Sequence, residues 1–344
     1  MTTTTSRVSV IGAGAWGTAL AIVLGRKGAL GFPREVRLWA NEPEVCESIA
    51  RSRINERFLP NFILPESITA TNDLNTALDG AEMIVSVMPS QHCRALFERM
   101  APSLQPHSLF VSCTKGLEDR TLMRMTEVIG DVLRNGKFTP RLAALSGPSF
   151  AKEVARGDPT AVTVASGDAE VTRAVQQAFN DSRFRVYTND DVIGVELGGA
   201  LKNIIAIAAG VCDGLGLGHN SVAALITRGL AEVARLVVAC GGRLDTMSGL
   251  AGLGDLVLTC TGDLSRNRSV GVELGKGRKL PDIIIGMRGA VAEGVFTTKA
   301  AVGLARKKNV EMPITGQMFA ILENGKSPQQ AIEELMTRAT KSEV

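Results

Sequence analysis

The sequence has few aromatic residues, few histidines and no closely paired cysteines. Aromatics make up 4% of the 344 residues, which leaves few side chains for stacking on nucleic-acid bases. The three histidines and six cysteines form no cluster with metal-ligand spacing, and no CxxC pair occurs, so we expect no metal site. Most cysteines lie in apolar segments, as buried thiols do, and a reducing cytoplasm is the expected location.

No stretch of the chain carries a concentrated charge of one sign. The formal net charge is +3, and the lysines and arginines are spread along the sequence. This distribution argues against a nucleic-acid partner and suits a small anionic ligand. The Thr-rich N-terminus leaves no room for a signal peptide before the first predicted strand at Val8, and no apolar run is expected to reach membrane-spanning length.

A glycine-rich turn follows the first predicted strand. Gly12, Gly14 and Gly17 form a GxGxxG pattern between the apolar run 8–11 and a helical run that includes residues 18–24. Gly12 would permit a tight turn, Gly14 would let the backbone approach a pyrophosphate, and Gly17 would let the helix pack close to the strand. The helix N-terminus adds N–H groups and a positive dipole end. The order of strand, turn and helix predicts a dinucleotide-binding βαβ unit.

Strand-like and helix-like segments alternate over the first half of the chain. A chain of this length usually needs more than one hydrophobic core, so two domains are expected. Strands are predicted at Val8–Ile11, Glu35–Trp39, Met83–Val87, Leu109–Ser112, Leu142–Ala144, Ala161–Ala165 and Arg183–Tyr187. From about residue 191 helical periodicity replaces the strands. The pattern predicts an α/β, Rossmann-like doubly wound sheet domain over residues 1–190 and an all-α domain over residues 191–344.

Lys202 is the most informative single charge. It lies among small and apolar residues in the segment 198–210, where desolvation would lower the pKa of its amine from about 10.4. An amine with a lowered pKa suits general acid–base work near neutral pH. Gly198 and Gly199, about one turn earlier, would leave room for a ligand. The alternative is a lysine whose stem covers apolar surface while its amine reaches water.

Five other residues could contribute to a site. Lys115 follows a predicted strand, where a fixed cation could polarise a carbonyl or hold an anion, or could simply be solvated. Ser265 is a plausible N-cap of a helix that opens with Arg266 and Asn267, which is either a phosphate cradle or an ordinary cap. Asp255 could pair with a lysine, but capping of a helix is the favoured interpretation.

The end of the second predicted strand bears on the coenzyme. Trp39 is followed by Ala40, Asn41 and Glu42. No acid stands directly at the strand end to bind a ribose 2′-hydroxyl, and no arginine stands there to bind a 2′-phosphate. The coenzyme is therefore expected to be NADP or NAD.

Several separate motifs, in order along nearly the whole chain, resemble those of bacterial-type NAD(P)-dependent glycerol-3-phosphate dehydrogenase. They occupy residues 11–20, 114–118, 146–151, 198–203, 251–261 and 265–268. The resemblance implies reversible NAD(P)H-dependent reduction of dihydroxyacetone phosphate to sn-glycerol 3-phosphate, which supplies glycerophospholipid synthesis. Asn41 stands where this family often has a basic residue, and the segment Ala29–Arg34 looks longer than usual.

The resemblance also implies roles for single residues. Lys202 corresponds to the proton donor and acceptor. The implied substrate-binding residues are Lys115, Gly147, Ser149, Lys202, Asp255, Ser265, Arg266 and Asn267. Besides Gly12, Gly14 and Gly17 of the turn, the implied coenzyme-binding residues are Ala15, Trp16, Asn41, Lys115, Ala151, Arg266, Val291 and Glu293. The expected partner is a phosphorylated small molecule, and a homo-oligomer is compatible with the sequence.

Two other interpretations stay open at this stage. One is a hydroxyacid or imine reductase of the same two-domain plan, against which a phosphate site at residues 265–267 argues. The other is a non-catalytic NAD(P)H sensor, against which Lys202 and Lys115 argue.

Overall fold

The computed structural model describes residues 6–26, 34–135, 139–287, 291–340 and 342. It divides the chain into unit 1, which is Met1–Lys115 with Met123–Glu196, and unit 2, which is Gly116–Leu122 with Leu197–Val344. The predicted domain boundary was residue 190. The division between the two units lies later, between Glu196 and Leu197, inside a helix. All but the last residue of the segment Ala29–Arg34 lies outside the described residues.

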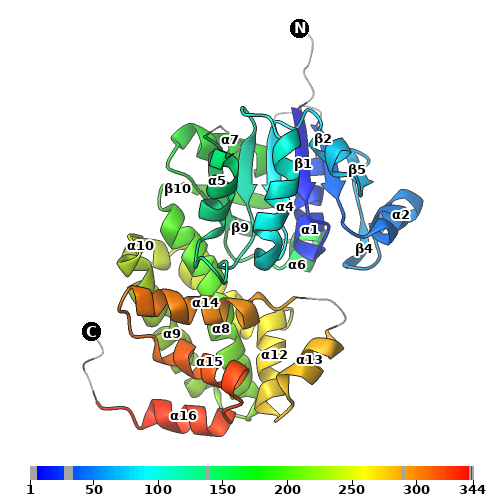
Figure 1. Ribbon diagram of the computed structural model, residues 1–344. Helices are drawn as coiled ribbons and strands as arrows, with labels where there is room; N and C mark the ends of the chain where they lie inside the picture. Colours follow the sequence, from blue (N-terminus) through cyan, green and yellow to red (C-terminus); the bar gives the residue numbers. More distant parts are fainter. Residues whose placement is uncertain (1–5, 27–33, 136–138, 288–290, 341, 343–344) are drawn as a thin grey trace. The chain divides into compact units, whose positions relative to one another are not determined.

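Unit 1 is built on an eight-stranded sheet with the order β10-β9-β8-β7-β6-β1-β2-β5 (Figure 1). Neighbouring strands are parallel, except that β8 and β9 are antiparallel. The strands are β1 (Ser6–Ile11), β2 (Arg34–Trp39), β5 (Ile68–Thr71), β6 (Met83–Ser86), β7 (Leu109–Ser112), β8 (Arg141–Ser146), β9 (Thr160–Ala165) and β10 (Phe184–Asn189), and the hairpin β3 (Ile54–Asn55) and β4 (Leu59–Ile63) lies apart from the sheet. The seven predicted strands are confirmed; β5 and the hairpin were not predicted.

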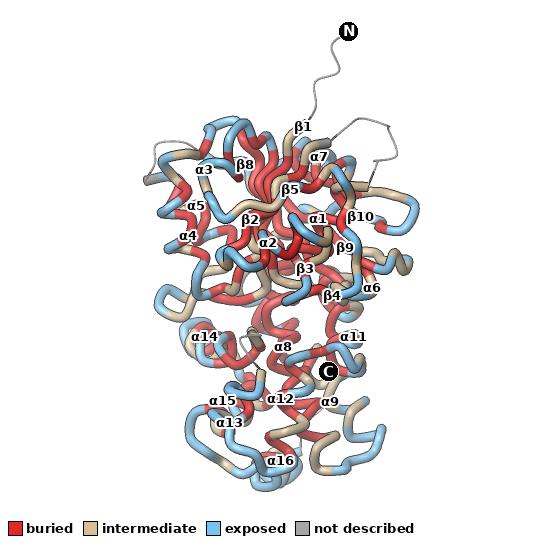
Figure 2. The backbone as a smooth tube through the Cα atoms, turned by 90° about the vertical axis from the view of Figure 1, so that its right-hand side faces the viewer, coloured by how far each residue is buried: buried red, intermediate tan, exposed pale blue. Residues whose placement is uncertain are grey.

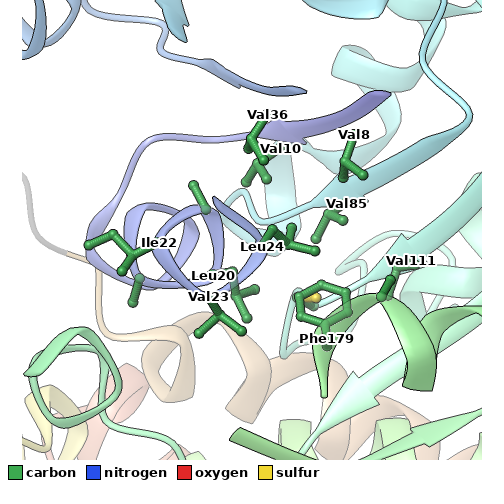
Figure 3. Close-up of a cluster of buried hydrophobic side chains, with 14 of the residues drawn as sticks. Val8, Val10, Leu20, Ile22, Val23, Leu24, Val36, Val85, Val111 and Phe179 are labelled. Atoms are coloured by element: carbon green, nitrogen blue, oxygen red, sulfur yellow. The ribbon is translucent and has the colours of Figure 1, made fainter. Parts of the chain in front are cut away.

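Helices cover both faces of this sheet. They are α1 (Ala15–Gly25), α2 (Pro43–Ser52), α3 (Leu74–Leu78), α4 (Cys93–Met100), α5 (Met125–Asn135), α6 (Ala151–Arg156) and α7 (Ala169–Phe179). On one face, Leu20 and Leu24 of α1 pack against strand valines such as Val10 and against Phe179 of α7 (Figure 3). Each such leucine contributes roughly 1.5–3 kcal/mol when fully buried. α1 is apolar on all sides because the sheet and α6 both cover it.

The described residues of unit 2 contain helices and no strand, as predicted for this part of the chain. The helices are α8 (Val192–Gly214, whose first turn lies in unit 1), α9 (His219–Ala239), α10 (Leu244–Met247), α11 (Asp255–Thr261), α12 (Arg266–Gly275), α13 (Leu280–Gly286), α14 (Glu293–Lys307), α15 (Pro313–Asn324) and α16 (Pro328–Met336), with a π-helical segment at Leu250–Gly254.

α8 is the most apolar long helix of the described chain. Its 23 residues are long and apolar enough to cross a membrane, so the expectation that no apolar run has this length is wrong. However, 83% of its apolar window is buried inside the protein, as Figure 2 shows along the course of α8. The helix therefore has the surroundings of a core helix.

The first turn of α8 is anchored in unit 1 by a buried carboxylate. Glu196 accepts hydrogen bonds from the backbone N–H of Thr126 at 2.8 Å, from the Thr126 hydroxyl at 2.5 Å and from the Arg124 guanidinium at 2.5 Å. Both donors lie at the N-terminal end of α5. Burial raises the pKa of the Glu196 carboxyl, while Arg124 and Thr126 act in the opposite direction. This cluster ties the first turn of α8 to the start of α5.

Further along α8, glycines bring its backbone against the backbone of α12. A Cβ on Gly271 of α12 would lie 1.9 Å from the carbonyl oxygen of Ile207, and a Cβ on Gly210 of α8 would lie 2.0 Å from that of Arg268. A real Cβ cannot come that close to an oxygen, so the two helices can pack this way only with glycine at both places.

We predict that Gly271→Ala lowers the free energy of unfolding by about 1–3 kcal/mol or more, because the methyl group would force α12 away from α8. Gly286→Ala is the matched control, since a Cβ at Gly286 would meet no heavy atom within 4 Å. Thermal melts of the two variants check this. Equal melting temperatures for Gly271→Ala and the unaltered chain would contradict the close contact.

Candidate active site

The predicted site residues fall into two sets, one in each unit. Unit 1 holds Gly12, Gly14, Ala15, Trp16, Gly17, Asn41, Lys115, Gly147, Ser149 and Ala151, and unit 2 holds Lys202, Asp255, Ser265, Arg266, Asn267, Val291 and Glu293.

The glycine turn of unit 1 has the geometry that a dinucleotide-binding turn requires. Gly12 has a φ of +118°, and a Cβ there would lie 2.3 Å from the carbonyl oxygen of Val87. A Cβ on Gly17 would lie 1.8 Å from the carbonyl oxygen of Gly12, whereas a Cβ on Gly14 would meet nothing within 4 Å. Gly12 and Gly17 are therefore needed for the turn itself, and Gly14 leaves the backbone at the start of α1 open. The pyrophosphate of NAD or NADP fits such a cradle.

Asn55 holds this turn and was missed by the sequence analysis. Its side-chain amide donates to the carbonyl oxygen of Ala13 and to the hydroxyl of Thr18, both at 2.8 Å, and its own oxygen accepts from the N–H of Phe58 at 3.1 Å. Asn55 is fully buried. A buried amide with these three hydrogen bonds locks the turn in one conformation.

Lys115, Gly147 and Ser149 come together at the ends of β7 and β8. The Lys115 amine donates to the carbonyl oxygen of Gly147 at 3.1 Å, and the Ser149 hydroxyl donates to the same oxygen at 2.9 Å. Gly147 has a φ of +144°, and a Cβ there would lie 2.9 Å from the Cα of Val162. The family resemblance implied that these residues bind substrate, and the structure brings them into one cluster.

The other unit 1 residues lie at the ends of strands and the starts of helices. Ala15 and Trp16 open α1, and Ala151 opens α6. Asn41 is exposed just after β2, whose last residue, Trp39, accepts a hydrogen bond from the N–H of Gly12 at 3.1 Å. The turn after β2 is therefore tied to the glycine turn.

Lys202 is the centre of the unit 2 set. Lys202 is 6% exposed and Asp255 is 1% exposed. The Lys202 amine forms an ion pair with the Asp255 carboxylate and donates a hydrogen bond to the Thr259 hydroxyl at 2.8 Å. The Thr259 hydroxyl donates in turn to the carbonyl oxygen of Asp255 at 2.6 Å. The expected burial of Lys202 is confirmed. The neighbouring carboxylate favours the ammonium form, which opposes the effect of desolvation on the amine.

Two expectations about the surroundings of Lys202 are wrong. Asp255 does not cap a helix: it is the first residue of α11, the N-cap is Gly254, and the carboxylate pairs with Lys202 instead. Gly198 does not leave room for a ligand, because a Cβ there would lie 2.8 Å from the carbonyl oxygen of Ala251. Gly198 thus lets α8 contact the π-helical segment, which leads directly into Asp255.

Thr259 was missed as a site residue although a signal existed. It lies four residues after Asp255 on the same helix, so the two side chains share a face. The next residue, Cys260, is a buried thiol, as expected: burial raises its pKa to about 12, with Lys202 acting against this shift and Asp255 adding to it. Cys260 is therefore protonated at neutral pH and is no nucleophile.

The start of α12 has the predicted cap. The Ser265 hydroxyl accepts from the N–H of Arg268 at 3.2 Å, which confirms Ser265 as the N-cap. Asn267 is buried and donates to the side-chain oxygen of Asn203 at 2.9 Å, while its own oxygen accepts from the N–H of Gly294 at 3.0 Å. The bond to Asn203, the residue after Lys202, ties α12 to α8. The bond from Gly294 ties α12 to α14.

Arg266, Val291 and Glu293 lie around the same helix ends. Arg266 is the first residue of α12 and is exposed. Desolvation by nearby protein lowers the pKa of its guanidinium, and the Glu293 carboxylate opposes this shift only in part. Glu293 opens α14, and Val291 is half-buried just before it. A cation, a capped helix N-terminus and an amide side chain at one place can bind a phosphate.

Sequence profiles of known families match both halves of the chain. Residues 7–172 match the N-terminal profile of NAD-dependent glycerol-3-phosphate dehydrogenase, and residues 191–333 match the C-terminal profile of the same family. Among solved structures, glycerol-3-phosphate dehydrogenase from Coxiella burnetii superposes with a TM-score of 0.91 at 43% identity, covering 97% of this chain and 99% of that one.

Full-length relatives agree with the family profiles. A glycerol-3-phosphate dehydrogenase [NAD(P)+] of Koribacter versatilis is 66% identical over 98% of this chain and 99% of its own length. The enzyme of that name from Geobacter sulfurreducens is 52% identical over 98% of each chain. This chain therefore belongs to the NAD-dependent glycerol-3-phosphate dehydrogenase family.

Proposed function

We propose that this protein reversibly reduces dihydroxyacetone phosphate to sn-glycerol 3-phosphate with NADH or NADPH and so supplies glycerophospholipid synthesis. The observation that carries the proposal is the buried cluster of Lys202, Asp255 and Thr259, set in a chain that belongs to this family. Family membership does not favour a hydroxyacid or imine reductase or a non-catalytic sensor.

Lys202 is proposed as the group that moves the proton. Reduced nicotinamide, when bound, supplies a hydride to the ketone carbon of the substrate. The ammonium of Lys202 then gives a proton from Nζ to the developing alkoxide oxygen, and it takes one back in the reverse direction. Asp255 and Thr259 hold the amine in one orientation and keep it charged while it is buried.

Ser265, Arg266 and Asn267 are proposed to bind the substrate phosphate. The substrate offers little apolar surface, so the phosphate must supply much of its binding energy. Arg266 would form charge-assisted hydrogen bonds to phosphate oxygens, and the N–H groups at the start of α12 would add to them. Lys115, beside Gly147 and Ser149, is proposed to bind an anionic or carbonyl oxygen of the substrate.

Gly12, Gly14 and Gly17 are proposed to bind the coenzyme pyrophosphate, with Ala15, Trp16, Asn41, Lys115, Ala151, Arg266, Val291 and Glu293 as further coenzyme contacts. The open space beside Gly14 supports this role for the turn. We further propose that the protein works in the cytoplasm and that it can form a homo-oligomer.

The direct test of the function is an assay of the purified chain. We expect oxidation of NADH or NADPH, followed at 340 nm, on addition of dihydroxyacetone phosphate, and reduction of NAD(P)+ with sn-glycerol 3-phosphate. A panel of unphosphorylated 2-oxo and 3-oxo acids should give little turnover. Turnover with such acids but not with dihydroxyacetone phosphate would overturn the proposal.

Gly14→Ala should weaken NADH binding while leaving the fold intact, because the added methyl occupies only the open space beside the turn. Gly17→Ala should lower the melting temperature, because its Cβ would collide with the carbonyl oxygen of Gly12. Calorimetric titration with NADH and thermal melts separate the two effects. Unchanged NADH affinity in Gly14→Ala would remove the pyrophosphate from this place.

Arg266→Ala should lower kcat/KM for dihydroxyacetone phosphate roughly 10- to 150-fold, since a charge-assisted hydrogen bond is worth about 1.5–3 kcal/mol. The loss with unphosphorylated dihydroxyacetone should be much smaller. Arg278→Ala is the control, because Arg278 is half exposed and pairs with Glu273. Equal losses for the two substrates would contradict the phosphate assignment.

A further inference from the structure

The turn after β2 lies where the adenosine ribose of a dinucleotide is read in this kind of fold. Trp39, the last residue of β2, is paired in register with Ile11 of β1, and its carbonyl oxygen accepts from the N–H of Gly12. The next residue, Ala40, is small and fully buried, and its N–H donates to the carbonyl oxygen of Thr71 at 2.9 Å. The side chains that can face the ribose from this turn are therefore those of Asn41 and Glu42.

Neither of these side chains suits a 2′-phosphate. Asn41 is exposed and neutral, and it can donate to and accept from ribose hydroxyls. Glu42 is half-buried, and although it occupies the N-cap position of α2, its side chain makes no capping hydrogen bond there. A carboxylate at this turn accepts hydrogen bonds from ribose hydroxyls and repels a phosphate dianion.

The arginines near this turn in the sequence already have partners. Arg37, Arg51, Arg53 and Arg57 are the cationic residues between Glu35 and Gln91, since this stretch has no lysine or histidine. Arg51 pairs with Glu56 at 3.1 Å, and Arg57 pairs with Glu44.

The other two arginines are held by more than one group. The Arg53 guanidinium donates to the carbonyl oxygens of Ile68 at 2.9 Å, Leu64 at 3.2 Å and Pro65. Arg37 pairs with Glu35 at 2.8 Å and donates to main-chain carbonyls of Thr76 and Asp79. Moving Arg37 or Arg53 onto a phosphate would leave a carboxylate or several carbonyls without their donor, whereas the pairs of Arg51 and Arg57 are exposed and weak.

We propose that Asn41 and Glu42 make this enzyme prefer NADH over NADPH. The inference rests on the proposed function, because it assigns the adenosine end of the proposed coenzyme to the turn after β2. Asn41 and Glu42 bind the 2′- and 3′-hydroxyls of the adenosine ribose. A 2′-phosphate at the same place meets the Glu42 carboxylate, and each arginine between Glu35 and Gln91 would have to leave a present partner to reach it.

The test is calorimetric binding of NADH and NADPH to the purified full-length chain. The dissociation constant for NADH is expected to be at least about tenfold lower than that for NADPH. Glu42→Arg should tighten NADPH binding at least about tenfold and weaken NADH binding. Asn41→Ala should weaken NADH binding more than NADPH binding, because it removes a partner of the ribose hydroxyls.

Glu47→Arg is the matched control, since it makes the same charge change at an exposed position of α2, five residues after Glu42. It should leave the ratio of the two constants within about twofold. Equal binding of the two coenzymes, tighter binding of NADPH, or an equal shift in Glu47→Arg and Glu42→Arg would overturn the preference alone. Absence of binding by either coenzyme would overturn the proposed function and this inference with it.

Discussion

The close approach of backbones along α8 is the constraint on which the helical unit depends. Gly198 admits the π-helical segment before α11, Gly210 and Gly271 admit α12, and Gly294 admits α14, where a Cβ would lie 2.7 Å from the carbonyl oxygen of Asn203. Each contact leaves no space for a methyl group. One helix therefore fixes the positions of three other segments. The first leads directly into Asp255, and α12 and α14 carry Arg266 and Glu293.

This packing explains why Lys202 can be both buried and charged. A lone ammonium inside apolar protein would be costly, but the segment held by Gly198 delivers Asp255 to it, and one turn of α11 later comes Thr259. Removing one member of such a buried pair typically costs about 3–5 kcal/mol, because the other charge is left uncompensated. The cluster is thus costly to break and holds the amine in one place, which suits a group that must give its proton at one position.

The local patterns of the sequence predicted the main strands, the glycine turn, the helical second half and the burial of Lys202, because each is written in residues close together in the chain. The partners could not be read in this way. Lys202 and Asp255 are separated by 53 residues, and Asn55 lies 42 residues from Ala13, so only the fold brings them together. β5 was missed because only Ile68 of its residues is buried, which leaves no alternating pattern. Glycines in helices carry no signal that distinguishes close packing from space for a ligand, and Gly198 was misread for that reason.

The central claim is that the amine of Lys202 transfers the proton during reduction. Its most direct test is the turnover number of Lys202→Met with saturating dihydroxyacetone phosphate and NADH, beside Lys299→Met, which removes an exposed lysine paired with Asp119. General acid catalysis is worth about 10²- to 10⁴-fold, so kcat of Lys202→Met should fall by at least about a hundredfold while Lys299→Met stays near the unaltered enzyme. A folded Lys202→Met variant that turns over within a few-fold of the unaltered enzyme would contradict the account.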